Sequence, residues 1–210
     1  MHSFMNQKYI TGNNLQVEQS NTEIGTVRLA ILKDLPYVLD LSKKESFSIG
    51  FIPKMAYEAA ITGIKTGDRW SNTCNDKLFV IECNDTLVGF CLASFGQINS
   101  IMRMGRIAQI VLQVDARLIS RGRRLLNEVI KYGEKVYTNR WQCGCADDLP
   151  SNIFWQSMGW IKIGERMGIS HTNTWKQTSK RKVNVYRYDP LDLFISGQYF
   201  RLNNLQDKIE

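Results

Sequence analysis

Four arginines crowd the stretch between residues 112 and 126, where an apolar run gives way to a helix-like pattern. The apolar run Ile107 to Val114 stops at Asp115, and the periodicity after Gly122 predicts a helix. The N–H groups of a first helical turn are unpaired, and the helix dipole adds roughly half a positive charge there. A phosphate or pyrophosphate group is the ligand that suits such a turn. The arginines that add positive charge are Arg117, Arg121, Arg123 and Arg124.

The order of residues in this loop, and in a second segment, resembles the GNAT family of N-acetyltransferases. Arg117-x-x-Ser120-x-Gly122, followed by a Leu-Leu pair, resembles the family's acyl-CoA loop, Gln/Arg-x-x-Gly-x-Gly/Ala. Residues 148–160 resemble its second signature, in which an Asn ends a strand, a short helix follows and the segment closes with Phe/Leu-Tyr-x-x-x-Gly-Phe. The positions in register there are Ser151, Phe154, Gly159 and Trp160. The resemblance covers roughly residues 27–188.

This resemblance implies an acyl-CoA-dependent N-acyltransferase that moves acetyl from acetyl-CoA directly to a primary amine. It implies that the loop holds the CoA pyrophosphate and that the strand near Leu112 aligns the pantetheine arm. The cofactor-binding residues it implies are Leu112, Arg117, Leu118, Ser120, Arg121, Gly122, Arg123 and Asn152. The catalytic residues it implies are Asp148 and Asn152, with Asp148 standing where the family usually has asparagine.

Two departures from the family's pattern concern proton transfer. Trp155 stands where many members have a tyrosine that protonates the departing thiolate, and an indole N–H is not a practical proton source. Gln109 and Gln113 occupy the strand from which members often present a glutamate base. Asp147 or Asp148 could serve as the base, or both could be turn residues that cap the next helix. A degenerate protein that binds CoA or a protein partner without turnover is therefore an alternative.

A second alternative follows from charge. The net charge is +7 and the sequence pI is about 9.2. Basic residues interleave with aromatic ones over residues 175–188, which indicates either a nucleic-acid surface or an exposed hairpin with a basic turn. A GNAT-fold protein that modifies a DNA base or tRNA would use this stretch as a nucleic-acid surface. The residues concerned are Trp175, Lys176, Lys180, Arg181, Lys182, Tyr186, Arg187 and Tyr188.

The cysteine count and the hydropathy indicate where the protein works. Five cysteines, an odd number set mostly in apolar segments, predict buried thiols in a reducing compartment, and hence a cytoplasmic location. With only two histidines and no second cysteine pair, no metal site is expected. No apolar run approaches the ~18 residues of a membrane span, so no membrane partner is expected. Residues 1–21 lack the order of a signal peptide.

The predicted helices and strands follow the order β–α–α–β–β–β–α–β–α–β–β along the chain. Helices are predicted from Asp34, over 54–62, after Gly122 and over 151–157, with loops at 46–53 and 68–76. The predicted strands are 26–32, 77–83, 86–95, 103–114, 141–145, 160–167 and 182–188. A turn is predicted at Asn84-Asp85 and a bulge at Gly89.

This order predicts an α/β protein of GNAT-like fold, whose central, mostly antiparallel mixed sheet is flanked by helices. We expect residues 1–22 to be a flexible extension, 23–189 the acetyltransferase domain and 190–210 a tail. By analogy with the fold, the 46–53 loop, the 53–63 helix and the 168–182 hairpin should line the acceptor side.

Overall fold

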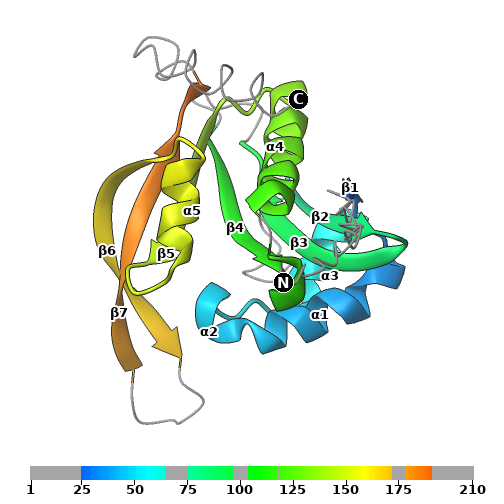
Figure 1. Cartoon of the computed structure of the whole chain (residues 1–210), viewed down its shortest axis with the longest axis horizontal. Coiled ribbons are helices and arrows are strands. Elements are labelled where there is room, and N and C mark those ends of the chain that lie inside the picture. Colours follow the sequence, from blue (N-terminus) through cyan, green and yellow to red (C-terminus); the bar gives the residue numbers. More distant parts are fainter. Residues whose placement is uncertain (1–24, 65–74, 97–103, 118, 172–177, 191–210) are drawn as a thin grey trace, which may run out of the picture.

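The computed structural model describes residues 25–64, 75–96, 104–117, 119–171 and 178–190 (Figure 1). Within them one seven-stranded sheet has the order β1-β2-β3-β4-β5-β7-β6, and only β4 and β5 are parallel neighbours. The predicted mostly antiparallel mixed sheet is therefore confirmed. The strands are β1 (Thr26–Leu29), β2 (Asp76–Cys83), β3 (Thr86–Ser94), β4 (Met104–Leu112), β5 (Arg140–Ala146), β6 (Ile161–His171) and β7 (Thr178–Tyr188). The segments predicted as an extension and a tail lie outside the described residues, apart from Pro190.

The helices flank the sheet, and α1, α2 and α3 gather together while α4 and α5 stand on either side of β4 (Figure 1). Their bounds are α1 (Leu35–Lys44), α2 (Ser46–Ile49), α3 (Lys54–Thr62), α4 (Ile119–Lys135) and α5 (Ser151–Ser157), with short 3-10 turns η1 (Leu32–Asp34) and η2 (Val114–Ala116). None of the described helices combines the length and apolarity needed to cross a membrane.

Local sequence signals fixed some helix ends better than others. α3 and α5 have the predicted bounds, and α3 ends at Gly63, whose φ of +74° suits a residue without a Cβ. The prediction of a loop over 46–53 was wrong in its first half, because residues 46–49 form α2. α4 begins at Ile119, earlier than predicted, so Gly122 lies inside its first turn. A glycine suits this position because a larger residue would crowd the ring of Phe154.

Apolar side chains fill both faces of the sheet. Leu125, Leu126 and Val129 of α4 pack with Trp141 of β5 on one face. A Cβ on Gly133 would lie 2.3 Å from a ring carbon of Trp141, so α4 reaches this strand only because residue 133 has no side chain. On the other face, a second cluster joins α1 and α3 to β2, β3 and β4, with Val38, Tyr57, Leu78, Val80 and Phe90 fully buried. Burial of each large apolar side chain contributes about 1.5–3 kcal/mol.

The turn predicted at Asn84-Asp85 is confirmed, and both residues have positive φ, 48° and 58°, as a tight hairpin turn requires. The bulge expected at Gly89 lies next to it. Ile81 pairs with Gly89 and Glu82 with Leu87, so the extra residue of β3 is Val88. Gly89 itself allows a close approach, because a Cβ there would lie 2.4 Å from the carbonyl oxygen of Val111.

A second bulge, in β4, opens the sheet. Leu92 and Ala93 of β3 pair with Gln109 and Ile107, which leaves Ala108 as the extra residue. A bulge bends its strand and disrupts the ladder locally. The parallel pairing of β4 with β5 ends there, at Ile107 and Cys143, although both strands continue. Beyond Ile107 the two central strands diverge, and the β4 edge that faces β5 has no strand partner in the described sheet.

Candidate functional site

A cavity of about 290 Å³ occupies the space that opens between β4 and β5. Its lining comes from both sides of the sheet: Gly122 of α4 and Phe154 of α5 on one, and Ser48 and Ile49 of α2 on the other. Residues 107–112 of β4 form one long wall. Among the described lining residues, only Arg117 and Cys145 carry titratable groups. The cavity is thus mostly apolar, with the exposed backbone edge of β4 along one side.

The first turn of α4 closes one end of this cavity. A Cβ on Gly122 would lie 3.1 Å from Cε2 of Phe154 and 3.8 Å from Cδ1 of Leu112. The two segments that resemble family signatures therefore touch each other here. Ser120 is exposed, and Arg121 and Arg123 are half-buried in the same turn. The turn has the free N–H groups, the dipole and the positive side chains of an anion site. Leu118 lies outside the described residues.

Arg117 lines the cavity but already has partners. Its Nη2 lies 2.6 Å from Oε1 of Glu45, and its Nε donates to the carbonyl oxygen of Leu112 at 3.3 Å. Glu45 stands between α1 and α2. This arginine therefore ties the loop before α4 to the α1–α2 junction, and an anionic ligand would compete with Glu45 for it.

Gln109 does not behave as a base, but it joins a buried polar chain. Tyr57 donates its hydroxyl proton to Oε1 of Gln109 at 2.5 Å, and the Tyr57 oxygen lies 2.8 Å from Oγ of Ser42. The Gln109 amide donates to the carbonyl oxygens of Gly50, at 3.1 Å, and Ile49, at 3.4 Å. Burial raises the pKa of Tyr57, so its hydroxyl stays protonated. This chain fixes the end of α2 against the cavity wall.

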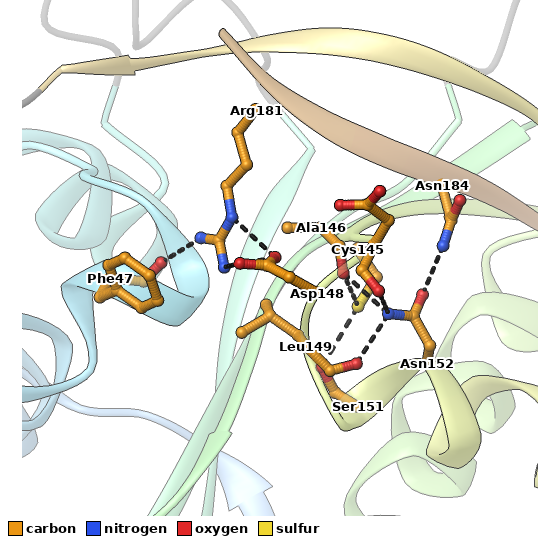
Figure 2. A network of polar contacts seen from close by, with 10 residues as sticks. Phe47, Cys145, Ala146, Asp148, Leu149, Ser151, Asn152, Arg181 and Asn184 are labelled. Atoms are coloured by element: carbon orange, nitrogen blue, oxygen red, sulfur yellow. Dashed lines mark hydrogen bonds and ion pairs between the residues drawn. The ribbon is translucent and has the colours of Figure 1, made fainter. Parts of the chain in front are cut away.

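Asn152 organises the turn between β5 and α5. Its amide nitrogen donates to the carbonyl oxygens of Ala146 and Leu149, both at 2.7 Å. Its amide oxygen accepts hydrogen bonds from Asn184 Nδ2 and from the Tyr186 hydroxyl, both at 2.9 Å. Figure 2 shows this side chain between the turn and β7. The geometry favours a structural role, because both ends of the amide are engaged by the protein itself.

Asp148 is held by Arg181 of β7 (Figure 2). Its two carboxylate oxygens accept hydrogen bonds from Nε and Nη2 of the guanidinium, both at 2.9 Å. The third nitrogen, Nη1, donates to the carbonyl oxygen of Phe47 at 2.6 Å, and the guanidinium carbon lies 4.4 Å from the centre of the Phe47 ring. Arg181 thus bridges α2 and the β5–α5 turn, across the divergence of the sheet, and occupies the carboxylate that was a candidate base.

Trp155 is a packing residue. It is 4% exposed, and its ring centre lies 4.8 Å from that of Trp160 and 5.3 Å from that of Phe154. Beside it, Cys145 lines the cavity with its Sγ 3.2 Å from Oγ of Ser151. Burial raises the pKa of the Cys145 thiol, which therefore stays protonated and is a poor nucleophile.

The structure brings Leu112, Arg117 and Gly122 together at the cavity, whereas Asp148 in the β5–α5 turn and Asn152 in the first turn of α5 are not lining residues. The sequence did not single out Glu45, it offered Tyr57 only as one of several aromatic residues on the acceptor side, and it placed Arg181 only in a basic stretch. Their partners are far along the chain, Gln109, Arg117 and Phe47, and no local pattern reveals such pairs. Because side chains alternate along β7, Arg181 and Lys182 lie on opposite faces of the sheet. Arg181 pairs with Asp148, and Lys182 pairs with Glu165.

Comparison with solved structures identifies the fold. Arabidopsis thaliana NAA60, solved with a bisubstrate analogue, superposes with a TM-score of 0.63 at 12% identity, covering 78% of this chain and 97% of its own. A GNAT-family acetyltransferase from Streptococcus pneumoniae gives 0.59 at 15% identity, covering 78% and 98%. Spermidine N-acetyltransferase from Vibrio cholerae, solved with CoA and spermine, gives 0.58 at 17% identity, covering 78% and 94%. No protein-family model and no curated protein sequence matches the chain.

Proposed function

The chain has the fold of the GNAT acetyltransferases, and we propose that it is an acyl-CoA-dependent N-acyltransferase that moves acetyl from acetyl-CoA to a primary amine. One observation carries this proposal: the mostly apolar cavity between β4 and β5, which extends from the first turn of α4 to α2. A thioester placed in that space would be reachable from both faces of the sheet. The buried, free cysteines Cys83, Cys91, Cys143 and Cys145 support a cytoplasmic location as part of the proposal.

The residues present suit a CoA thioester. The pyrophosphate would lie at the first turn of α4, held by Ser120, Gly122 and the side chains of Arg121 and Arg123. Leu118, outside the described residues, completes the proposed set. Arg117 would join them by giving up Glu45. The pantetheine amides would bond to the free edge of β4 up to Leu112, as an added strand does. The acyl group would then lie near the bulge at Ala108, where backbone groups can polarise a carbonyl.

The chemistry that acetyl-CoA supplies is an activated acyl group, and the protein contributes positioning. Orientation alone can lower a barrier by about 7–11 kcal/mol. Gln109 and Trp155 cannot accept a proton, and Asp148 is paired with Arg181. The amine would therefore have to arrive unprotonated. The protonated Cys145 thiol favours direct transfer over an acyl-cysteine intermediate.

Mass spectrometry with isotopically labelled acetyl-CoA tests the proposal. The protein is incubated with a panel of primary amines, and we expect labelled N-acetyl product to accumulate with stoichiometric release of CoA. Tight binding of acetyl-CoA without any product would instead indicate a protein that binds CoA without turnover. The missing acid and base motivate that alternative, so the assay should be run up to about pH 9, where more of each amine is neutral.

A further inference from the structure

One face of the sheet beside the cavity carries an arginine whose function is unassigned. Across the sheet, Gly144 pairs with Val185, Ala146 with Val183, and Val183 with Arg166. These residues lie on a common face, because side chains in paired strands alternate together. The opposite face of the same strands carries Cys143, Cys145 and Tyr186, which belong to the core beneath α4 and α5.

The guanidinium of Arg166 lies against Gly144, a lining residue of the cavity, although Arg166 is not itself a lining residue. A Cβ on Gly144 would lie 3.3 Å from Nη2 of Arg166, and Gly144 lines the cavity. The missing side chain of Gly144 leaves room for the arginine to lie over β5. Arg166 is itself exposed and reaches back from β6, so its charge borders the apolar space between β4 and β5.

Arg166 also lacks a partner within the described part of the chain, where it makes neither a hydrogen bond nor an ion pair. Arg181, on the same face two positions before Val183, is already matched by Asp148. The two basic residues thus differ: Arg181 is used to hold the fold together, and Arg166 is left available at the cavity.

We propose that Arg166 binds a carboxylate on the acceptor, so that the acceptors of this site are amino acids. A guanidinium is permanently charged and presents paired N–H donors that match a carboxylate. With its carboxylate on Arg166, which covers Gly144, an amino acid would direct its amine toward the space between β4 and β5. This inference rests on the proposed N-acetyltransferase function and names its acceptor class.

Steady-state kinetics with matched acceptors tests the inference. The panel is a set of L-amino acids, each with its amide and its decarboxylated amine, assayed by release of CoA from acetyl-CoA. We expect kcat/KM to be at least about tenfold higher for an amino acid than for its amide, as loss of a charge-assisted hydrogen bond predicts. In Arg166→Gln this preference disappears through a higher KM for the amino acid, while the KM for acetyl-CoA is unchanged.

Arg106→Gln is the matched control. Arg106 is exposed and pairs with Gln142 in the same sheet, but unlike Arg166 it has no atom within 4 Å of a Cβ placed on Gly144. This variant should keep the preference. If Arg166→Gln and Arg106→Gln lost the preference for the carboxylate equally, the loss would come from removing a positive charge anywhere on this face, and that result would overturn the inference. So would wild-type activity that ignores the carboxylate, or activity restricted to acidic peptides or tRNA. Calorimetry on the same samples distinguishes the two proposals. If the protein binds no acetyl-CoA, the proposed function is wrong. If it binds acetyl-CoA but acetylates no amino acid, only this inference is wrong.

Discussion

Asn152 lies in the segment that resembles a family signature, and its contacts explain why an amide is needed there. The side chain donates to the carbonyl oxygens of Ala146 and Leu149 and accepts from Asn184 and Tyr186. Only a group with both donors and an acceptor can do this. The position therefore holds the β5–α5 turn in shape, and through that turn it keeps α5 beside the cavity.

Replacement of Asn152 by Asp should destabilise the protein. The new carboxylate cannot donate, and it would place an oxygen against two carbonyl oxygens that now accept hydrogen bonds. The cost of leaving such groups unsatisfied is about 1–3 kcal/mol. Urea unfolding at pH 7 measures it, with the exposed Asn139→Asp as a control that should change the free energy of unfolding by less than about 0.5 kcal/mol. An unchanged free energy in Asn152→Asp, together with lost acetyl transfer, would assign Asn152 to the reacting centre instead.

At the scale of elements, a charged cluster joins β1 to the start of α1. Arg28 of β1 donates to Asp34 at 2.7 and 3.1 Å and to Glu82 of β2 at 3.1 Å. The backbone N–H of Ile31 donates to the same Asp34 carboxylate at 2.8 Å. The hydrogen bonds from Arg28, more than the one from Ile31, lower the pKa of buried Asp34. One carboxylate therefore fixes where the first strand ends and the first helix begins.

The stability that Asp34 contributes should depend on pH. Its folded-state pKa is lower than the ordinary 3.8, so the contribution is complete above that value and is lost as the pH falls through the lowered folded-state value. Asp34→Asn should therefore cost about 1–3 kcal/mol at pH 7 and progressively less at acid pH. Urea unfolding of both proteins between pH 7 and pH 2.5 measures the gap. A gap that stays constant over this range would show that the charge of Asp34 is not what stabilises the junction.

How far the sequence predicted this molecule depends on the range of the interactions involved. The α3 and α5 bounds, the Asn84-Asp85 turn and the strands follow from local periodicity, Pro and Gly positions. α2 was missed because a single turn of helix has no periodicity of its own, and it is held by Gln109 and Arg181 from distant strands. The bulge at Ala108 also escaped prediction, since only the register with β3 reveals it.

The candidate site divides in the same way. Arg117 and Gly122 could be found from motif spacing, because the loop and the helix that it enters are contiguous. The distant side chains that pair with the candidate residues could not be found from motif spacing, although such pairs decide whether a side chain is available to a ligand. Asp148 is a candidate base in the sequence, but in the structure it pairs with Arg181, which is distant along the chain. Arg166 becomes a candidate binding residue only through its position over Gly144.

For the whole molecule, the net charge of +7 raises the question of nucleic acid. Part of the positive charge of β6 and β7 is already matched: Arg181 pairs with Asp148, and Lys182 and Lys162 share the single carboxylate of Glu165. We therefore expect only weak, non-specific binding to tRNA and duplex DNA.

Gel shifts across salt concentrations check that expectation. Because phosphate contacts release counterions, any complex seen at about 50 mM salt should be gone by about 200 mM. Arg187→Gln and Lys182→Gln should change it little. A complex that survives at 200 mM salt and prefers tRNA or one DNA sequence would favour the nucleic-acid alternative over a small acceptor.

Calorimetric titration with acetyl-CoA measures whether the space between β4 and β5, closed by the first turn of α4, is the donor site. We predict one acetyl-CoA bound per chain. In Gly122→Glu, a carboxylate beside Phe154 would fill the turn and repel the pyrophosphate, weakening binding at least tenfold, or about 1.4 kcal/mol. Asn127→Glu, the same gain of charge further along α4, should bind normally, and thermal unfolding confirms that both variants fold. Wild-type protein that binds no acetyl-CoA, or Gly122→Glu that binds it as the wild type does, would contradict the account.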